Sequence, residues 1–314
     1  MAAAYAVPRP SFLASRFVAV SAILLVILAV WYVGAIFLNT NAQNLFDARD
    51  GRTPTLRQFI ESTWSQSKPR LPAPHQIAIE LWNTTGEIAL ATKGTFVERV
   101  QKTLANRQGL FYHTSVTLSS TLLGFAMGTL LGIGLAVLVV HVASLDKSLM
   151  PWIVSSQTVP ILAIAPMIIV VLAAVGITGL LPKALISTYL SFFPVTVGMV
   201  KGLRSPEPIH LDLMRTYNAG SAQIFSKLRW PASLPFLFVS MKVAIAASLV
   251  GAIVGELPTG AVAGLGARLL GGSYYGLTLQ MWAALVAASL MAGILVAIVG
   301  FIERRVVRRM GLAR

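Results

Sequence analysis

Long apolar stretches separated by polar ones dominate this chain. The stretch from Phe17 to Leu38 holds 22 residues without a charge. A helix of that length, rising about 1.5 Å per residue, spans about 33 Å, which is enough for a bilayer core. The pattern predicts an all-α membrane protein with about six transmembrane helices. The other expected spans cover residues 115–142, 152–175, 182–200, a fifth that starts between Leu234 and Met241 and runs to Leu257, and 278–302.

The first apolar stretch has an alternative interpretation as a cleaved signal peptide. Such a peptide has an apolar core of about 7–15 residues, followed by small residues. The stretch here is longer and contains Trp31 and Tyr32, so we favour a retained span. Residues 1–38 then form an N-terminal cytoplasmic tail and the first transmembrane helix.

Residues 39–113 form a polar segment with nine Lys or Arg and six Asp or Glu. Its stretch from Lys68 to Pro74 is an extended turn in which no helix is expected before Pro74. We expect this segment to be external and to contain short interfacial helices, and a solvated external loop fits it as well as any binding role. The apolar residues spaced as on such helices are Ile77, Leu81, Ile88, Val97, Val100 and Leu104.

The second expected span is rich in glycine. Gly124, Gly128 and Gly132 recur every four residues, and Gly134 follows them. This spacing of small residues lets helix backbones approach closely in lipid. It indicates a helix that packs inside a bundle rather than one that faces lipid.

Prolines and polar side chains interrupt the third expected span. Pro160 and Pro166 leave carbonyl groups that neighbouring groups must satisfy, and Ser155 and Gln157 lie close by in the sequence. A kinked, partly polar helix is a candidate wall for a translocation path. The alternative is a kink that serves packing alone.

Glu256 lies at the end of the fifth expected span, and an ionisable residue in a span is a functional candidate by default. It stands two residues before Pro258, at the outer boundary, where we expect its carboxylate to be exposed at little cost. A role at a gate or a helix end is favoured over contact with a solute. The candidate residues of the path are Ser155, Gln157, Pro160 and Glu256.

Composition supports the membrane assignment. Charged residues make up 11% of the 314 residues, against about 25% in soluble domains, and the mean hydropathy is +0.75. The chain has no cysteine, which excludes disulfides and thiol chemistry. Its four histidines are scattered, so no metal site is expected.

The net charge of +14 is explained by membrane orientation. With both termini cytoplasmic, the positive-inside rule leaves only Lys183 and Arg268 on the short outer segments, and Lys242 can snorkel from the fifth span. No polyanionic partner is needed, and we expect no nucleic acid. The inner basic residues are Arg9, Arg16, Lys147, Lys201, Arg204, Arg215, Lys227, Arg229, Arg304, Arg305, Arg308, Arg309 and Arg314.

A polar hairpin is predicted between the fourth and fifth spans. Ser205 and Pro206 are typical of a helix start, as N-cap and first helical residue, and Asn218 favours the end of that helix. Ser221 can cap a second short helix, which Pro231 ends. The apolar faces expected on the two helices consist of Ile209, Leu213 and Tyr217, and of Ile224, Phe225 and Leu228.

This hairpin resembles the cytoplasmic coupling loop of the membrane subunits of binding-protein-dependent ATP-binding-cassette (ABC) importers. That loop reads Glu-Ala-Ala, three residues, Gly, nine residues, Ile, one residue, Leu-Pro. Here Asp212, Leu213 and Met214 stand in the Glu-Ala-Ala places, with a shorter carboxylate and bulkier apolar residues, and Asn218 stands in the Gly place. The resemblance places the coupling loop at residues 203–233, with contact residues Asp212, Leu213, Met214, Arg215, Thr216, Tyr217, Asn218, Ala219, Gly220, Leu228 and Pro231.

Motifs on either side of the hairpin resemble the nitrate, sulfonate and taurine branch of these importers. They extend the resemblance over about residues 71–310. The motifs are Leu71 to Pro74, His113 to Leu118 with Gly124-Phe125, Thr158 to Pro160, Phe193-Pro194, Val254 to Leu257, and Gly264 to Gly266.

The resemblance implies an ABC importer type I permease fold in a bacterial inner membrane, with a core at residues 114–314. It implies a path for a small solute, either nitrate, a sulfonate or taurine, or a vitamin or pyrimidine-like heterocycle. The implied partners are an external solute-binding protein, a second permease copy that forms a homodimer, and a separate ATPase subunit.

No enzymatic activity is expected of the chain itself. It lacks the Gly-x-x-x-x-Gly-Lys-Ser/Thr phosphate loop, so we expect ATP to bind to the partner subunit. The sequence suggests no nucleophile–base pair, and we expect no cofactor on this chain. A secondary transporter or channel without an ATPase is the alternative. It predicts charged pairs at mid-membrane or inverted repeats, and neither is visible in the sequence.

Overall fold

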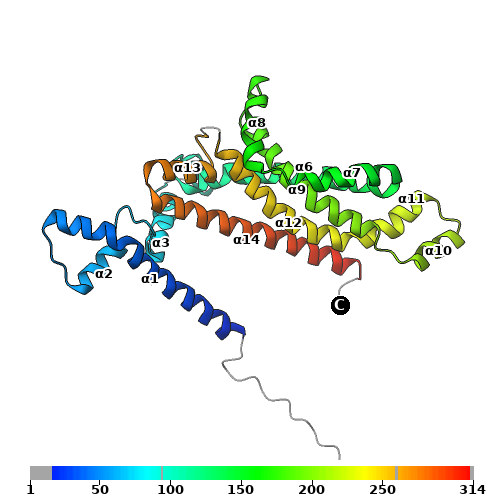
Figure 1. Ribbon diagram of the computed structural model, residues 1–314. Coiled ribbons are helices and arrows are strands. Elements are labelled where there is room, and N and C mark those ends of the chain that lie inside the picture. The colour runs from blue at the N-terminus through cyan, green and yellow to red at the C-terminus, as the bar shows by residue number, and fades with distance from the viewer. Residues whose placement is uncertain (1–15, 93–94, 259–260, 312–314) are drawn as a thin grey trace, which may run out of the picture. The chain divides into compact units, whose positions relative to one another are not determined.

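The computed structural model describes residues 16–92, 95–258 and 261–311, and every regular element in these ranges is a helix (Figure 1). This confirms the all-α prediction. Arg9 and Arg314, which were counted among the inner basic residues, lie outside the described residues.

Five described helices are long and apolar enough to cross a membrane, and a bent pair makes a sixth span if its two helices count as one. The number agrees with the six spans predicted. The long helices are α1 (Arg16–Asp50), α6 (Leu110–His141), α9 (Leu180–Leu203), α12 (Trp230–Glu256) and α14 (Thr278–Arg309).

The bent pair occupies the position of the third expected span. It consists of α7 (Ala143–Ser156) and α8 (Ile161–Ala174), whose axes differ by 98°. Pro160 is the N-cap of α8, so the helix breaks at the first of the two prolines, because the residue before a proline is disfavoured in helical conformation. Pro166 is accommodated inside α8. The kink is therefore much sharper than that of one continuous helix.

The described chain divides into two compact units, one of them formed by residues up to Asn83 together with Gly272–Ala283. Asn39 on α1 is the polar centre of this unit. Its amide group donates to the carbonyl oxygens of Thr63 (3.2 Å) and Leu71 (3.0 Å), and its Oδ1 accepts from the N–H of Arg70 (2.8 Å). One fully buried side chain therefore ties α1 to α2 (Leu56–Trp64) and to the turn before α3 (Pro74–Trp82).

The polar segment contains more helix than its composition suggested. α1 continues to Asp50, beyond the apolar stretch that ends at Leu38. Short helices follow, as expected around Ile77, Leu81, Ile88, Val97, Val100 and Leu104, whereas the helix at Leu56–Trp64 was not expected. They are α2, α3, a π-helical turn η2 (Asn83–Glu87), α4 (Ile88–Ala91) and α5 (Phe96–Ala105).

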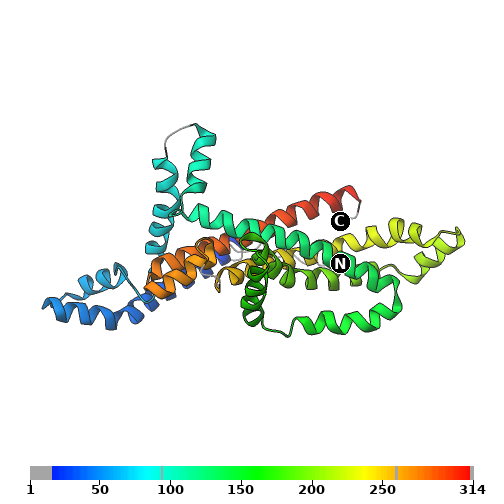
Figure 2. The ribbon, with the colours of Figure 1, turned by 90° about the horizontal axis from the view of Figure 1, so that it is seen from above.

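The second unit contains residues Thr84–Gly271 and Ala284–Arg314, and α6, α9 and α12 run side by side at its centre (Figures 1 and 2). Glycines make their close approach possible. A Cβ added at Gly124 on α6 would lie 2.2 Å from Cβ of Ser187 on α9, and one at Gly251 on α12 would lie 2.7 Å from Cα of Ser187. Gly128 and Gly132 are packed in the same way, whereas Gly134 faces open space. The prediction of a bundle helix is confirmed for the first three glycines.

Lys242 has a partner inside this unit. Its ammonium forms an ion pair with Glu303 on α14. The positive charge is therefore neutralised inside the bundle, in addition to any snorkelling of the side chain towards the membrane surface. The aliphatic part of its side chain lies against Gly300, since a Cβ added at this glycine would be 3.6 Å from Cε of Lys242.

Candidate functional site

The hairpin between α9 and α12 is present, but its first helix begins later than predicted. α10 runs Pro208–Thr216, with Glu207 as its N-cap. The prediction of Ser205 as the N-cap is wrong, because the Ser205 hydroxyl donates to the carbonyl oxygen of Gly202 (2.7 Å) and so closes the end of α9. Pro206 and Pro208 are two possible first residues of the helix, and α10 begins at Pro208.

α10 exposes an apolar face. Ile209, Leu213 and Tyr217 lie on one side of the helix and are 69%, 52% and 77% exposed. Beside them, Asp212 and Arg215 form an exposed ion pair of 3.0 Å. Within the described chain, then, this helix presents an apolar stripe with a charged border that is not covered by other elements.

The turn after α10 has the geometry of a Schellman motif. Asn218 adopts φ +51°, the left-handed conformation that glycine adopts most readily. The N–H of Asn218 donates to the carbonyl of Arg215 (2.8 Å), and that of Ala219 donates to the carbonyl of Met214 (3.0 Å). The predicted helix end at Asn218 is confirmed, and asparagine fills the place that glycine has in the importer loop.

The second part of the hairpin is not a separate short helix. Gly220 is the N-cap of α11 (Ser221–Ile224), which continues through a π-helical turn, η3 (Phe225–Arg229), into α12. The prediction that Ser221 caps this helix is wrong, since Ser221 is its first residue, and so is the prediction that Pro231 ends it. In the wider π turn the N–H of Trp230 reaches back to the carbonyl of Phe225, and the helix passes the proline without breaking.

The remaining predicted coupling residues follow this geometry. Phe225 packs on the ring of His141 from α6 at a centroid distance of 5.3 Å, which anchors the second part of the hairpin to the bundle. Thr216 turns its hydroxyl back to the carbonyl of Leu213 (2.7 Å). The half-buried coupling residues are Met214, Ala219, Leu228 and Pro231. The exposed coupling residues are Asp212, Leu213, Arg215, Thr216, Tyr217, Asn218 and Gly220.

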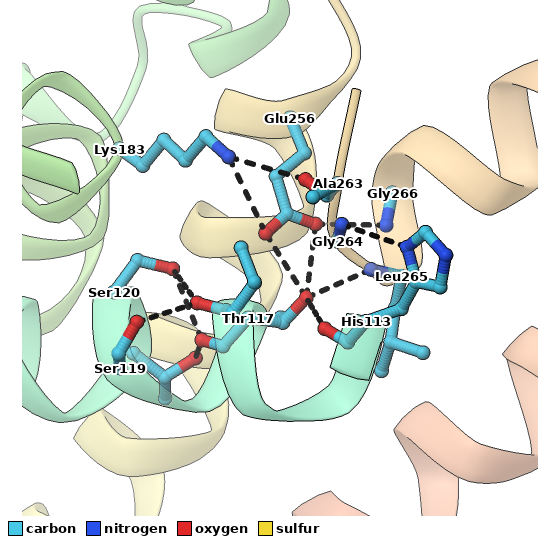
Figure 3. A network of polar contacts seen from close by, with 12 residues as sticks. His113, Thr117, Ser119, Ser120, Lys183, Glu256, Ala263, Gly264, Leu265 and Gly266 are labelled. Carbon is cyan, nitrogen blue, oxygen red and sulfur yellow. Dashed lines mark hydrogen bonds and ion pairs between the residues drawn. The ribbon is translucent and has the colours of Figure 1, made fainter. Parts of the chain in front are cut away.

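A second candidate site surrounds Glu256 at the end of α12 (Figure 3). Its side chain is 0% exposed, so the prediction of an exposed carboxylate at the span boundary is wrong. Both carboxylate oxygens lie 3.0 Å from the Thr117 hydroxyl on α6, and Oε2 accepts from the N–H of Gly266 (2.8 Å). The segment after α12 folds back over the carboxylate and excludes it from solvent.

Residues 264–266 form the cover of this site, and each of their backbone N–H groups has a partner. Gly264 donates to Nδ1 of His113 (3.1 Å), Leu265 to the hydroxyl of Thr117 (2.8 Å) and Gly266 to Glu256. A Cβ at Gly264, which has φ +124°, would lie 2.2 Å from Cδ of Glu256. Only glycine lets the backbone pass this close to the carboxylate.

Lys183 at the beginning of α9 completes the site. Its ammonium lies 3.9 Å from Oε1 of Glu256 and donates to the carbonyl oxygen of Ala263 (3.3 Å). His113 contacts the carbonyl of Arg107 through Nε2 (3.0 Å), which makes Nε2 the donor and leaves Nδ1 to accept from Gly264. We call Glu256, Thr117, Lys183, His113 and residues 264–266 the clasp.

The candidate path residues do not form one cluster. Ser155, Gln157 and Pro160 lie together at the break between α7 and α8, where Ser155 and Pro160 are exposed and Gln157 is half-buried. Glu256 belongs to the clasp instead. The bend itself is held from α9, because the Tyr189 hydroxyl donates to the carbonyl oxygen of Ser156.

Thr117, Lys183 and His113 were not among the predicted site residues. One signal was available for Lys183, since a lone basic residue on a short outer segment and a lone acidic residue at a span end are potential partners. His113 and Thr117 lie in the motif His113 to Leu118, but the motif indicated no role for them, because they meet Glu256 and Gly264 only through folding. Among the described residues, no group of three potential metal ligands is close enough to hold an ion.

The spans, the glycine-packed bundle and the exposed hairpin define the class of multi-pass helical membrane proteins. A family model described as the binding-protein-dependent transport system inner membrane component matches residues 128–312. The chain belongs to this family of ABC transporter permeases.

Curated relatives agree with the family. A probable ABC transporter permease protein of Haemophilus influenzae is 32% identical over 56% of this chain and 74% of its own length. The formylaminopyrimidine transport permease protein ThiX of Halalkalibacterium halodurans is 31% identical over 54% and 66%. The nitrate import permease protein NrtB of Leptolyngbya laminosa is 27% identical over 64% and 70%. The chain therefore falls among the permeases of the branch that its motifs resemble.

A solved structure supports the fold. It is described as the crystal structure of an amino acid ABC transporter with histidines, and it matches 68% of this chain and 100% of its own with a TM-score of 0.53. At 17% sequence identity, the likeness concerns the fold alone.

Proposed function

We propose that the chain is the membrane-spanning permease subunit of an ATP-driven importer, coupled to a separate ATPase subunit through the hairpin between α9 and α12. The observation that carries this proposal is the uncovered apolar face of α10, with Ile209, Leu213 and Tyr217 each more than half exposed. Large apolar side chains bordered by charges are typical of a docking surface. A groove on the ATPase that accepts one amphipathic helix would bury this face.

The hairpin has a rigid connection to the bundle. Residues Ser221–Glu256 form one helical stretch of 36 residues, and Phe225 and Trp230 pack beside the buried cluster that contains Leu237. Displacement of α10 by the ATPase would therefore reach α12 through the short turn at Asn218 and the continuous helix that follows it. ATP binding on the partner would favour one state of the bundle and hydrolysis the other, which is a population shift.

The solute path follows from the same proposal. An external solute-binding protein would deliver nitrate, a sulfonate or taurine, or a vitamin or pyrimidine-like heterocycle, and a second copy of the chain would complete the path. Ser155, Gln157 and Pro160, at the break between α7 and α8, remain our candidates for its wall. Glu256 would meet solute only after the clasp opens, because the carboxylate is fully buried.

Orientation is also part of the proposal. The hairpin and both termini would be cytoplasmic in a bacterial inner membrane, and the clasp and residues 39–113 would be external. The assignment rests on the positive-inside rule. We propose residues 1–38, 39–113 and 114–314 as tail with first span, external segment and permease core, respectively.

The test is co-purification of the tagged full chain from its native membrane, followed by mass spectrometry and an ATPase assay. The triple variant Ile209→Ser, Leu213→Ser and Tyr217→Ser should lose a co-purifying ATPase. The control is Leu56→Ser, because Leu56 is similarly exposed, at 78%, but lies on α2. Retention of the ATPase by the triple variant would show that α10 does not dock it. A chain that purifies alone and still moves solute would favour a secondary transporter or channel.

A further inference from the structure

A pocket lies beside the clasp, within the same compact unit. It has a volume of about 420 Å³ and is bounded by the end of α8, the beginning of α9 and residues 261–263. Most of its lining is apolar, including Ile169, Ile177 and Val262. Among the described residues that line it, Lys183 alone is charged.

The ammonium of Lys183 is incompletely satisfied by the described residues. It carries three N–H donors, but its contacts are a hydrogen bond of 3.3 Å to the Ala263 carbonyl and an ion pair of 3.9 Å with Glu256. The second distance is too long for a hydrogen bond. With its side chain 12% exposed, the ammonium finds its remaining acceptors only among water in the pocket, and an anion can displace that water and replace its hydrogen bonds.

We propose that this pocket is a subsite for a small anionic solute at the external end of the translocation path, and that Lys183 is the residue that binds the anion. The inference deepens the proposed importer function and rests on it. An oxyanion would supply the acceptors that the ammonium lacks, and the charge-assisted hydrogen bonds would be stronger than neutral ones. The apolar walls would hold a short organic group attached to that anion.

Glu256 does not prevent this binding. Its carboxylate is fully buried and held by Thr117 and Gly266, so it lies behind the ammonium and outside the lining of the pocket. Its negative charge partly neutralises Lys183 and weakens the attraction for an incoming anion. The affinity is therefore low, as an importer needs if its solute is to leave the site again.

Occupation of the subsite would also affect the cover of the clasp. The hydrogen bond from Lys183 to the Ala263 carbonyl holds the residue immediately before the glycine turn. An anion that draws the ammonium into the pocket would lengthen this bond. Solute binding and the release of residues 264–266 would then be linked through one side chain.

Binding can be measured by saturation-transfer NMR on the full permease–ATPase complex in lipid nanodiscs. The probe is methanesulfonate, its neutral control is dimethyl sulfone, and empty nanodiscs give the lipid background. We expect saturable binding of methanesulfonate in the millimolar range, competition by nitrate, and no saturable binding of the sulfone.

Four variants assign the binding to the pocket. Lys183→Met should abolish binding and Lys183→Arg should retain it. Ala173→Trp fills the pocket without touching either charge and should also abolish binding. Glu256→Gln removes the opposing charge and should lower the half-saturating concentration by at least about five-fold, because one Coulomb repulsion is worth about 1 kcal/mol at 4 Å in water and more where it is less screened. A purely structural ion pair predicts no such gain.

The same preparations separate failure of this inference from failure of the proposed function. A complex that retains its ATPase but shows no saturable methanesulfonate signal overturns the anion subsite alone. Unchanged binding in both Lys183→Met and Ala173→Trp also overturns it. Equal saturable binding of dimethyl sulfone would assign the pocket to neutral solutes and overturn it as well. Absence of any ATPase would overturn the proposed function, whatever the NMR result.

Discussion

The Glu256 carboxylate on α12 and the Thr117 hydroxyl on α6 are 139 residues apart in the sequence and 3.0 Å apart in the structure. The hydroxyl also accepts the N–H of Leu265. It therefore connects two spans and the segment that covers them. A buried carboxylate with partners on several elements is costly to leave unpaired, so loss of these partners should weaken the packing of residues 264–266 against α6 and α12.

Replacement of Glu256 tests the clasp. Glu256→Ala leaves Lys183 without its counter-ion and the N–H of Gly266 without an acceptor, and should lower the free energy of unfolding by about 3–5 kcal/mol. Glu256→Gln keeps an acceptor for Gly266 and should cost less than half as much. Thermal unfolding in detergent measures both. Glu207→Ala is the control and should have little effect, because Glu207 is exposed and its side chain makes no capping hydrogen bond to α10; equal midpoints for all three variants would contradict the prediction.

Gly264→Ala tests the cover of the clasp. The added Cβ would lie 2.2 Å from Cδ of Glu256 on a backbone with φ +124°, so both overpacking and backbone strain oppose it. We expect a loss of about 3 kcal/mol, measured as a lower unfolding midpoint. Gly271→Ala is the matched control, because a Cβ there meets nothing within 4 Å. A Gly264→Ala protein as stable as this control would show that the turn is not tightly packed.

Two glycines of α6 should respond in opposite ways to the same substitution. Gly124→Ala drives a methyl group into Ser187 on α9 and should destabilise the bundle by about 2–3 kcal/mol. Gly134→Ala points into open space and should be neutral or slightly stabilising, since alanine favours helix. Yield and unfolding midpoint of the detergent-purified proteins compare the two. Similar losses at both positions would indicate general intolerance of α6 instead of contact with α9.

The spans could be predicted because they depend on local composition. A stretch of about 20 apolar residues must cross as a helix, and the spacing of Gly124, Gly128 and Gly132 indicated which face is packed. The same reasoning could not distinguish Gly134, since its surroundings depend on which helices become neighbours. Asn218 was predictable because a Schellman turn is a local event.

The clasp could not be predicted, for a physical reason. At a span boundary an isolated Glu256 would be solvated, and only the return of residues 264–266 over it makes it buried. The continuation of the helix through Pro231 could not be predicted for a similar reason. A proline inside a helix removes a hydrogen bond and kinks or breaks the helix, and the π turn at Phe225–Arg229 that accommodates Pro231 has no clear signature in the sequence.

The turn at Asn218 gives a test of the hairpin geometry. Asn218→Gly should preserve α10 and the co-purifying ATPase, because glycine adopts a positive φ without strain. Asn218→Val places a β-branched residue at φ +51°, a strained combination, and should reduce the amount of ATPase recovered. Circular dichroism of the whole protein serves as the fold control. Equal recovery with both variants would mean that the direction of α10 is unimportant for docking.

The pair Asp212–Arg215 separates charge recognition from local helix stability. Both side chains are exposed and three residues apart on α10, so either charge reversal should leave the spans folded while uncoupling ATP hydrolysis from transport. The double variant Asp212→Arg/Arg215→Asp restores an ion pair within α10 but presents each charge at the wrong place. If the ATPase recognises these charges, coupling stays lost in the double variant; if the pair only stabilises α10, the swap restores coupling.

Arg57→Glu/Glu61→Arg exchanges another exposed pair, on α2, and should leave the ratio of solute transported to ATP hydrolysed unchanged. Normal ratios in both single reversals of the α10 pair would exclude a coupling role for these residues.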